Sequence, residues 1–302
     1  MTPQPPSPHP SLASAALPDA VERIAASVVG LSLRRGAASG AVWQPGIAVT
    51  AASSVWRASR LQIVLPDGEQ VEGTLRGVDP ATDLAAVAFE GGAVPAIERS
   101  PAAAPRVGDF VFAVGREPSG LVQASFGHVG AAAGEWRSWR GGRVERLIRL
   151  DGGLYPGLAG APVVDGSGQA IGIASPAFSR LHGVVLPVAT VDRVLAQLLA
   201  HGRVQQGYLG IAAQPVRASL DGAGTEGLLI SSVADDGPAA RAGLLVGDVI
   251  VSAGGQPVAS IEALRGRLGE QVGGRLELKL ARGGQGVQIA LDVAERPAGR
   301  CG

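Results

Sequence analysis

The chain has 302 residues, with 26 Lys and Arg against 26 Asp and Glu, and 46% of its residues are hydrophobic. This length suits two domains of ordinary size, and the hydrophobic content excludes a wholly disordered chain. Because the net charge is zero, the composition gives no support to a polyanion-binding protein, and no nucleic acid partner is expected.

The first residues, 1–18, are rich in proline and serine and lack both the basic start and the apolar run of a signal peptide. We expect them to form a disordered tail, and the sequence as written indicates a cytoplasmic protein. No transmembrane segment is expected, because no stretch reaches the ~18 uninterrupted apolar residues of a membrane helix. Cys301 is the single cysteine and the four histidines lack ligand spacing, so we expect neither a metal site nor a cofactor.

Short apolar runs alternate with turn signals between residues 28 and 185, which is typical of an all-β sandwich or barrel. So many short strands over this length predict two small barrels rather than one sheet. The predicted strands span residues 28–33, 41–49, 61–65, 70–78, 84–89, 110–114, 121–129, 144–150, 161–164 and 170–174.

The apolar pattern changes to a helical period at Val188, and Gly202 follows as a stop signal. This predicts a helix over 188–200 that closes a first domain of residues 19–202. Strand patterns around a helix at 261–268 predict a second domain over 203–296, and residues 297–302 are expected to form a flexible tail.

Three segments resemble, in order and spacing, the motifs of trypsin-like serine proteases of the HtrA (Deg) type. Residues 39–42 (SGAV) and 50–53 (TAAS) are similar to the strand and T-x-x-H segment that carry the family's general base. Residues 79–85 (DPATDLA) resemble its D-x-x-T-D-L-A segment, and residues 151–162 (DGGLYPGLAGAP) its nucleophile segment. The resemblance implies a mainly β fold, a trypsin-like double six-stranded β-barrel followed by a PDZ domain.

Carried over residue by residue, the family's triad falls on Ser53, Asp83 and Ala159. Alanine has no atom to attack with, and a neutral serine does not accept and return protons near neutral pH as an imidazole does. We therefore expect no intact catalytic residue and predict that the chain is no enzyme but a pseudoprotease. The family's oxyanion hole uses backbone N–H groups that fall on Gly157 and Ala159, and these do not depend on the missing hydroxyl.

A rearranged catalytic pair is the alternative enzyme hypothesis. Ser54 neighbours Ser53, and His128 and His182 lie in segments of the second barrel. Because a nucleophile must lie within hydrogen-bond reach of its base and no second G-x-S-G-G segment occurs, we interpret His182 as a loop residue and His128 as a residue on a strand face.

Arginines recur every three residues from Arg137 to Arg149, with Trp136 and Trp139 between them. This pattern superficially resembles a nucleic-acid patch with stacking aromatics. Such spacing alternates faces on a strand, and Glu135 and Glu145 dilute its charge. We interpret the segment as a solvated loop, with a contact to a partner, domain or anionic ligand as the alternative.

The second domain carries the most specific resemblance. Residues 206–211 (QGYLGI), 237–244 (GPAARAGL) and 247–250 (GDVI) look like the carboxylate-binding loop and following motifs of a bacterial PDZ module. Such a loop aims backbone N–H groups at a terminal carboxylate while the next strand pairs with the peptide. The expected peptide-binding residues are Tyr208, Leu209, Gly210, Ile211, Leu264 and Leu268.

The sequence thus predicts an HtrA-like pseudoprotease that binds peptides or protein C-termini in a scaffolding, regulatory or chaperone-like role. One alternative is an active serine endopeptidase of protein quality control with a rearranged site, and another is a regulatory subunit of an active paralogue. The resemblance also implies a homotrimer or a mixed assembly with a paralogue, and an extracytoplasmic location if the N-terminus is incomplete.

Overall fold

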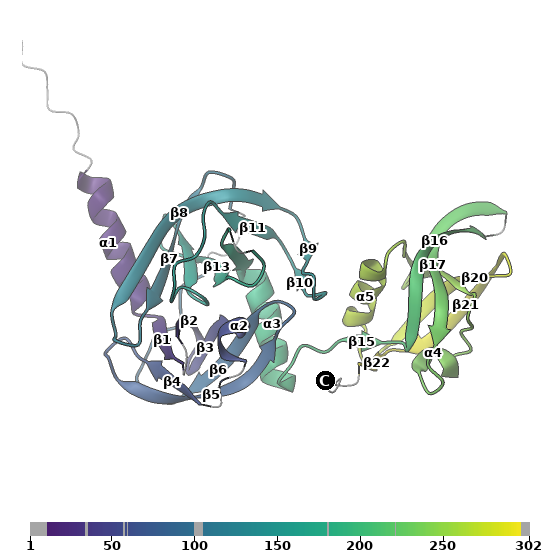
Figure 1. Ribbon diagram of the computed structural model, residues 1–302, viewed down its shortest axis with the longest axis horizontal. Coiled ribbons are helices and arrows are strands. Elements are labelled where there is room, and N and C mark those ends of the chain that lie inside the picture. Colours follow the sequence, from purple (N-terminus) through teal and green to yellow (C-terminus); the bar gives the residue numbers. More distant parts are fainter. Residues whose placement is uncertain are drawn as a thin grey trace, which may run out of the picture. The chain divides into compact units, whose positions relative to one another are not determined.

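The computed structural model describes residues 11–33, 36–56, 58, 60–99, 105–179, 181–220 and 222–296. The chain divides into two compact units, Met1–Val204 and Gln205–Gly302, each with its own hydrophobic core. Figure 1 shows both, the first built around barrels and the second around one sheet. We describe each unit by itself.

The first barrel of the first unit is a closed antiparallel sheet in the order β1-β2-β3-β6-β5-β4. Its interior is apolar, and side chains such as Leu31, Val42 and Ile63 are fully buried there. A short helix, α2 (Ala52–Val55), follows β3 directly. The strands are β1 (Val28–Ser32), β2 (Ala37–Gln44), β3 (Ile47–Ala51), β4 (Leu61–Val64), β5 (Gln70–Asp79) and β6 (Leu84–Phe89).

The second barrel closes in the order β11-β14-β13-β12-β7-β8, so the predicted pair of six-stranded barrels is confirmed. A small hairpin of β9 (Trp136–Arg137) and β10 (Arg143–Val144) stands between β8 and β11. The barrel strands are β7 (Phe110–Arg116), β8 (Val122–Ala133), β11 (Leu147–Leu150), β12 (Pro162–Asp165), β13 (Ala170–Ser175) and β14 (Val184–Pro187).

Two helices pack on the barrels. Helix α1 (Ser11–Ala25) buries Ala20 and Ile24 in the core that also holds Trp43 and Phe112. Helix α3 (Val188–His201) packs against strands of both barrels, and its Asp192 accepts a 2.7 Å hydrogen bond from the Trp43 indole. The helix ends at Gly202, whose left-handed backbone (φ 71°) glycine adopts without strain. No helix in the described part of the chain is both long and apolar enough to cross a membrane.

The second unit is a sheet in the order β16-β17-β18-β20-β21, with β19 paired to β18 and a small ladder of β15 and β22 beside it. Helix α5 (Ile261–Glu270) begins at Ser260, whose hydroxyl accepts the Ala263 N–H at 3.1 Å. The elements are β15 (Gly207–Tyr208), β16 (Ile211–Leu220), β17 (Ala223–Val233), α4 (Pro238–Arg241), β18 (Val249–Ala253), β19 (Gln256–Pro257), β20 (Arg275–Arg282), β21 (Gln285–Asp292) and β22 (Ala294–Glu295).

The structure differs from the sequence-based expectations in three places. Residues 11–18, assigned to a disordered tail, lie in α1, because Leu17 and the residues after it pack on the core. The single strand predicted over 41–49 is two strands, β2 and β3, joined at Gly46, whose φ of 71° permits a tight turn. The strand predicted over 144–150 is divided between β10 and β11. Residues 1–10 and 297–302, including His9 and Cys301, lie outside the described residues.

Candidate functional site

Asp83 lies between β5 and β6, is 2% exposed, and has a left-handed backbone (φ 57°). Its Oδ1 accepts the backbone N–H of Ser53 at 2.6 Å, and its Oδ2 accepts the hydroxyl of Ser175 at 2.6 Å. Burial raises the pKa of this carboxyl above its usual range, although hydrogen bonds from Ser175 and Ser53 act in the opposite direction. Asp83 is therefore a fixed hydrogen-bond acceptor that holds the first turn of α2.

Ser53 stands exposed on that turn, at the end of β3. The segment with Ala159 reaches the same place, because the Ser39 N–H donates to the Ala159 carbonyl at 3.0 Å. A Cβ added to Gly160 would lie only 2.6 Å from the Ala51 nitrogen. The structure therefore brings the segments of Ser53, Asp83 and Ala159 together. Position 53 holds a serine and no imidazole, and position 159 holds an alanine and no hydroxyl.

Gly157 and Ala159 belong to the segment that is hydrogen-bonded to Ser39. The Ser39 hydroxyl donates to the Gly157 carbonyl at 2.7 Å and so fixes the direction of that peptide group. Neither the Gly157 N–H nor the Ala159 N–H has an acceptor among the described residues. Two neighbouring N–H groups of this kind can hold a carbonyl or carboxylate oxygen. The sequence showed Ser39 as part of a motif but gave it no role, and Ser175 lies one residue beyond a predicted strand.

The histidines lie away from this constellation. His128 forms an ion pair with Asp151 when protonated, with 3.3 Å between Nε2 and Oδ2, and both side chains are largely exposed. The Nδ1 atom of His182 is buried without a hydrogen-bond partner. Within the ranges that the structure describes, no serine hydroxyl is hydrogen-bonded to a histidine ring, so the rearranged pairs considered from the sequence, including Ser54, are not assembled here.

The second candidate site is the loop between β15 and β16. The Leu209 carbonyl accepts the Ala239 N–H at 2.9 Å and the Gly210 carbonyl accepts the Ala234 N–H at 2.7 Å. Gly210 has a φ of 78°, which turns the chain sharply. Leu209 and Gly210 are both buried, yet their own N–H groups have no acceptor among the described residues. The loop is thus held by its carbonyls and presents two consecutive donors.

Strand β16 and helix α5 lie next to each other beside this loop. Strand β16 is the first strand of the sheet order, so one of its edges faces α5 rather than another described strand of the sheet. Leu209, Leu264 and Leu268 are 2%, 5% and 6% exposed and belong to the core, where Ile211 packs against them. Gly207 fits closely against the end of α5, because a Cβ there would overlap the Leu268 carbonyl. The Tyr208 hydroxyl lies beside Gly210, 3.2 Å from the position of a Cβ there.

Family models match both units. Residues 38–173 match the trypsin-like peptidase domain and residues 229–282 match the PDZ domain. A DegP-like periplasmic serine endoprotease of Chlamydia muridarum is 31% identical over 268 residues, which are 85% of this chain and 53% of that protein. A Brucella suis protein of the same name is 36% identical over 210 residues, which are 65% of this chain and 40% of that protein. The chain therefore spans about half the length of the curated relatives it matches.

Solved structures of the same type superpose on most of the chain. A serine endoprotease from Yersinia pestis has a TM-score of 0.76 at 25% identity and covers 96% of this chain and 100% of its own. The HtrA-type protease AlgW with a tripeptide has a TM-score of 0.76 at 27% identity, covering 94% of this chain and 98% of its own.

These comparisons contradict the prediction that the chain is no enzyme. The relatives and solved neighbours carry the names of serine endoproteases, which points to protease activity rather than to an inactive relative. The prediction rested on two side chains, Ser53 and Ala159, that were carried over from the family's motifs.

Proposed function

Because the chain joins a trypsin-like peptidase domain to a PDZ domain in the manner of HtrA-type proteases, we propose that it binds polypeptide C-termini in protein quality control. The PDZ domain captures the terminal carboxylate, in a scaffolding, regulatory or chaperone-like role. The observation that carries this proposal is that the N–H groups of two consecutive buried residues, Leu209 and Gly210, have no acceptor among the described residues.

A buried donor without an acceptor costs about 1–3 kcal/mol, so two in succession favour a ligand that satisfies both. A carboxylate offers two oxygens to two N–H groups, and charge-assisted hydrogen bonds are stronger than neutral ones. The edge of β16 offers backbone groups that continue the pairing along an extended peptide. Ile211 is only partly buried and packs against the core of Leu209, Leu264 and Leu268, so an apolar terminal side chain of the peptide would find apolar neighbours there.

Isothermal titration of the full chain with one apolar-ended peptide, as free acid and as amide, tests the proposal. We expect the free acid to bind at least about tenfold more tightly, because the amide removes the charge that strengthens both hydrogen bonds. Equal affinity for the two forms would contradict carboxylate capture.

The second candidate function is that of a serine endopeptidase whose catalytic site differs from the expected triad. It is favoured by the names of the relatives, by the retained Asp83 and by the N–H groups of Gly157 and Ala159. Hydrogen bonds between nucleophile and base are often long in a free enzyme and shorten when substrate binds. Ser53 and Ser54 are the serines nearest to Asp83 along α2.

A fluorophosphonate probe tests this candidate. Two results would support it. The probe should label one serine stoichiometrically in the folded chain and not in the denatured chain, and it should block cleavage of unfolded casein. Mass spectrometry of the labelled peptide would identify the nucleophile. Absence of both labelling and cleavage would contradict the endopeptidase candidate and leave C-terminal capture intact.

Assembly and compartment follow from the same family. Relatives are named periplasmic, and we propose an extracytoplasmic site of action and a homotrimer or a mixed assembly with a paralogue. Light scattering of the pure chain tests for the homotrimer. Co-purification after expression with a paralogue tests for the mixed assembly. A monomer in both experiments would contradict either form.

A further inference from the structure

The turn of the β9–β10 hairpin exposes an aromatic side chain that no core uses. Trp139 is 75% exposed, and the guanidinium carbon of Arg140 lies 4.4 Å from the centre of its ring. Such stacking places a cation and an apolar face on one surface. We call Arg137, Trp139 and Arg140 the hairpin tip.

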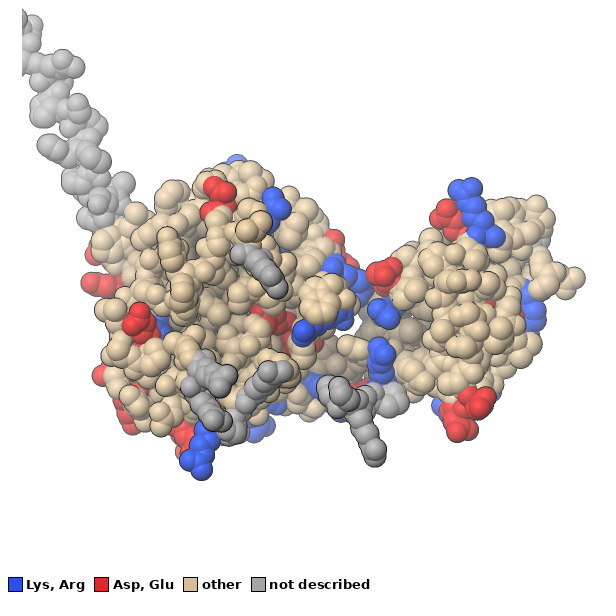
Figure 2. All heavy atoms as spheres, in the orientation of Figure 1, with Lys and Arg blue, Asp and Glu red and all other residues tan. Residues whose placement is uncertain are grey.

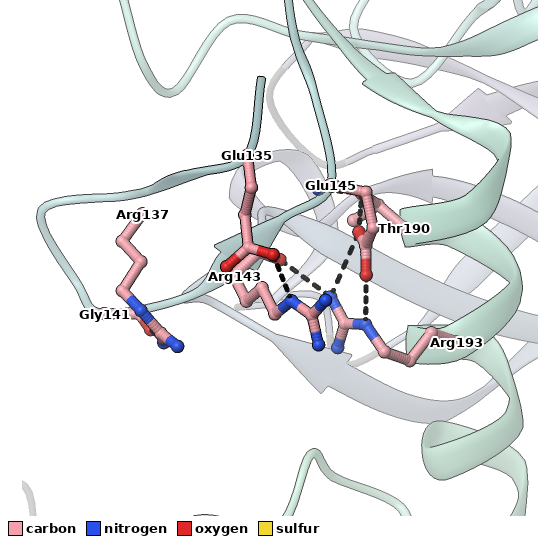
Figure 3. Close-up of polar contacts among 7 residues, drawn as sticks. All are labelled: Glu135, Arg137, Gly141, Arg143, Glu145, Thr190 and Arg193. Atoms are coloured by element: carbon pink, nitrogen blue, oxygen red, sulfur yellow. Dashed lines mark hydrogen bonds and ion pairs between the residues drawn. The ribbon is translucent and has the colours of Figure 1, made fainter. Parts of the chain in front are cut away.

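Charges at the base of the hairpin are neutralised, as Figure 3 shows. Arg143 pairs with Glu135 at 2.9 Å, and Arg193 pairs with Glu145 at 2.7 Å. Glu145 also accepts the hydroxyl of Thr190. The basic residues at the base are therefore already balanced by acidic neighbours of this chain.

The two arginines of the hairpin tip differ from those at its base. Arg137 lies apart from the paired cluster in Figure 3 and donates to the Gly141 carbonyl of its own turn, at 3.2 Å. Arg140 has the cation–π contact and no carboxylate within ion-pair distance in the part of the chain that the structure describes. Figure 2 shows basic side chains gathered where this hairpin lies in Figure 1.

The hairpin tip is held in place rather than loosely extended. The buried hydroxyl of Ser138 donates to the Ala81 carbonyl at 2.6 Å and accepts the N–H groups of Arg140 and Gly142 at 3.3 and 3.1 Å. Gly142 fits directly against Ala81, because a Cβ there would overlap the Ala81 carbonyl. A surface fixed before binding loses less conformational entropy when a ligand arrives.

The hairpin is attached to the segment that leads to Asp83. Ala81 precedes Asp83 by two residues, and the charge of Arg140 is near enough to act on Asp83 against the effect of burial. The hairpin tip is therefore anchored to the segment that carries Asp83.

We propose that the hairpin tip binds an acidic segment of a polypeptide, with carboxylates on Arg137 and Arg140 and an apolar or aromatic side chain on Trp139. Two guanidinium groups without a carboxylate partner match one or two carboxylates of a ligand. A nucleic acid would need a longer basic stripe, and an anionic membrane about 4–8 basic residues. This binding goes beyond the proposed capture of C-termini, because it uses side chains of the other unit and needs no terminal carboxylate.

The test is fluorescence anisotropy of a labelled Glu-rich peptide with an amidated C-terminus, which excludes capture of a terminal carboxylate. We expect binding that weakens as salt rises from low to physiological concentration. The Arg137→Gln/Arg140→Gln variant should bind about fivefold or more weakly, and Trp139→Ala about threefold more weakly. A matched Gln-rich peptide should not bind.

The control variant Arg106→Gln/Arg217→Gln removes two arginines that are 86% and 88% exposed elsewhere, and so changes the net charge equally. It should bind the acidic peptide as the unmodified chain does. Equal weakening by both variants, no binding of the acidic peptide, or tip-dependent binding of single-stranded nucleic acid in its place would each overturn the proposal. The Arg137→Gln/Arg140→Gln variant should bind the free-acid peptide with unchanged affinity. Failure of acidic-peptide binding at the hairpin tip can therefore be told apart from failure of C-terminal capture.

Discussion

The cleft around Ser53 and the loop at Leu209 both present two unpaired backbone N–H groups, yet the two regions depend on sequence in different ways. At the first site, catalysis would also need particular side chains at positions 53 and 159, where a serine and an alanine stand. The loop needs only backbone geometry, a glycine turn at Gly210 and the apolar floor beneath it.

The two sites therefore differ in how they tolerate substitution. Backbone donors survive almost any change of side chain as long as the chain path is kept. A nucleophile and its base are lost with a single substitution each. The following variants disturb the chain path or the charged groups in one region at a time.

The largest effect is expected from Gly160→Ala. Gly160 has a φ of 80°, and an added Cβ would lie 2.6 Å from the Ala51 nitrogen and overlap the Thr50 hydroxyl and Ser39 carbonyl. The free energy of unfolding of the first unit should fall by about 3 kcal/mol or more, from backbone strain and overpacking together. Denaturant unfolding followed by tryptophan fluorescence measures it, since all four tryptophans lie in this unit.

Gly120→Ala is the matched control for that change. Gly120 has a φ of 89° but no atom within 4 Å of an added Cβ, so only the strain of about 1 kcal/mol should remain. Equal losses for the two variants would show that the close contact at Gly160 does not hold the cleft together.

The next effect concerns the loop. Gly210→Ala forces a side chain into a left-handed backbone (φ 78°) near the Tyr208 hydroxyl, and should weaken binding of a free-acid peptide about tenfold. Isothermal titration gives the ratio. Gly283→Ala, at a turn with a φ of 58° and open space around it, should bind as the unmodified chain does. Unchanged binding by the Gly210 variant would contradict a role for the loop.

Two buried carboxylates predict opposite effects of pH in the two units. Burial raises the pKa of Asp83 above its unfolded value of about 3.9, so its contribution to stability is present below that value and lost as pH rises through the folded pKa. Asp79 shares this direction, because burial outweighs its hydrogen bonds. Asp83→Asn should therefore reduce the decline in stability of the first unit above about pH 4.

Asp248 behaves in the reverse way. Burial acts to raise its pKa, but hydrogen bonds from Arg282 at 2.7 Å and from the Leu245 N–H, with the charge of Arg282, lower it overall. Its contribution is present above the unfolded pKa and lost as pH falls through the folded one. Asp248→Asn should remove part of the acid sensitivity of the second unit. Hydrogen exchange read by mass spectrometry resolves both units, and the same pH trend in both would contradict these assignments.

The smallest effect is expected from Ser53→Ala. The side chain is exposed and the backbone N–H to Asp83 at 2.6 Å remains, so unfolding should change by less than about 0.5 kcal/mol. The same variant tests the endopeptidase candidate, because loss of fluorophosphonate labelling would identify Ser53 as the nucleophile. Retained labelling would exclude it.

Much of the fold could be predicted from local patterns, and the exceptions have physical causes. The two barrels follow from alternating apolar runs and glycine turns. The single strand predicted over 41–49 passed over a turn signal at Pro45 and Gly46, which the exposed Gln44 and Pro45 mark in the structure. Helix α1 contains Pro18, which disfavours a helix locally, and it forms because Ala20 and Ile24 pack on the barrels.

The candidate sites could be predicted only where a motif fixes the chain path. Ser53, Asp83 and Ala159 were placed by spacing, and the structure brings them together. The unpaired state of the N–H groups at Gly157 and Leu209 depends on contacts distant in sequence, which spacing does not record. The division of the arginines into paired and unpaired ones needed the positions of Glu135 and Glu145 in space.

The most direct test of carboxylate capture is an NMR titration of the isotope-labelled full chain with the free-acid peptide and then with its amide. The account predicts that the Leu209 and Gly210 amide protons show the largest downfield shifts, and only with the free acid. Unmoved signals at these two residues, or the same shifts with the amide, would contradict it.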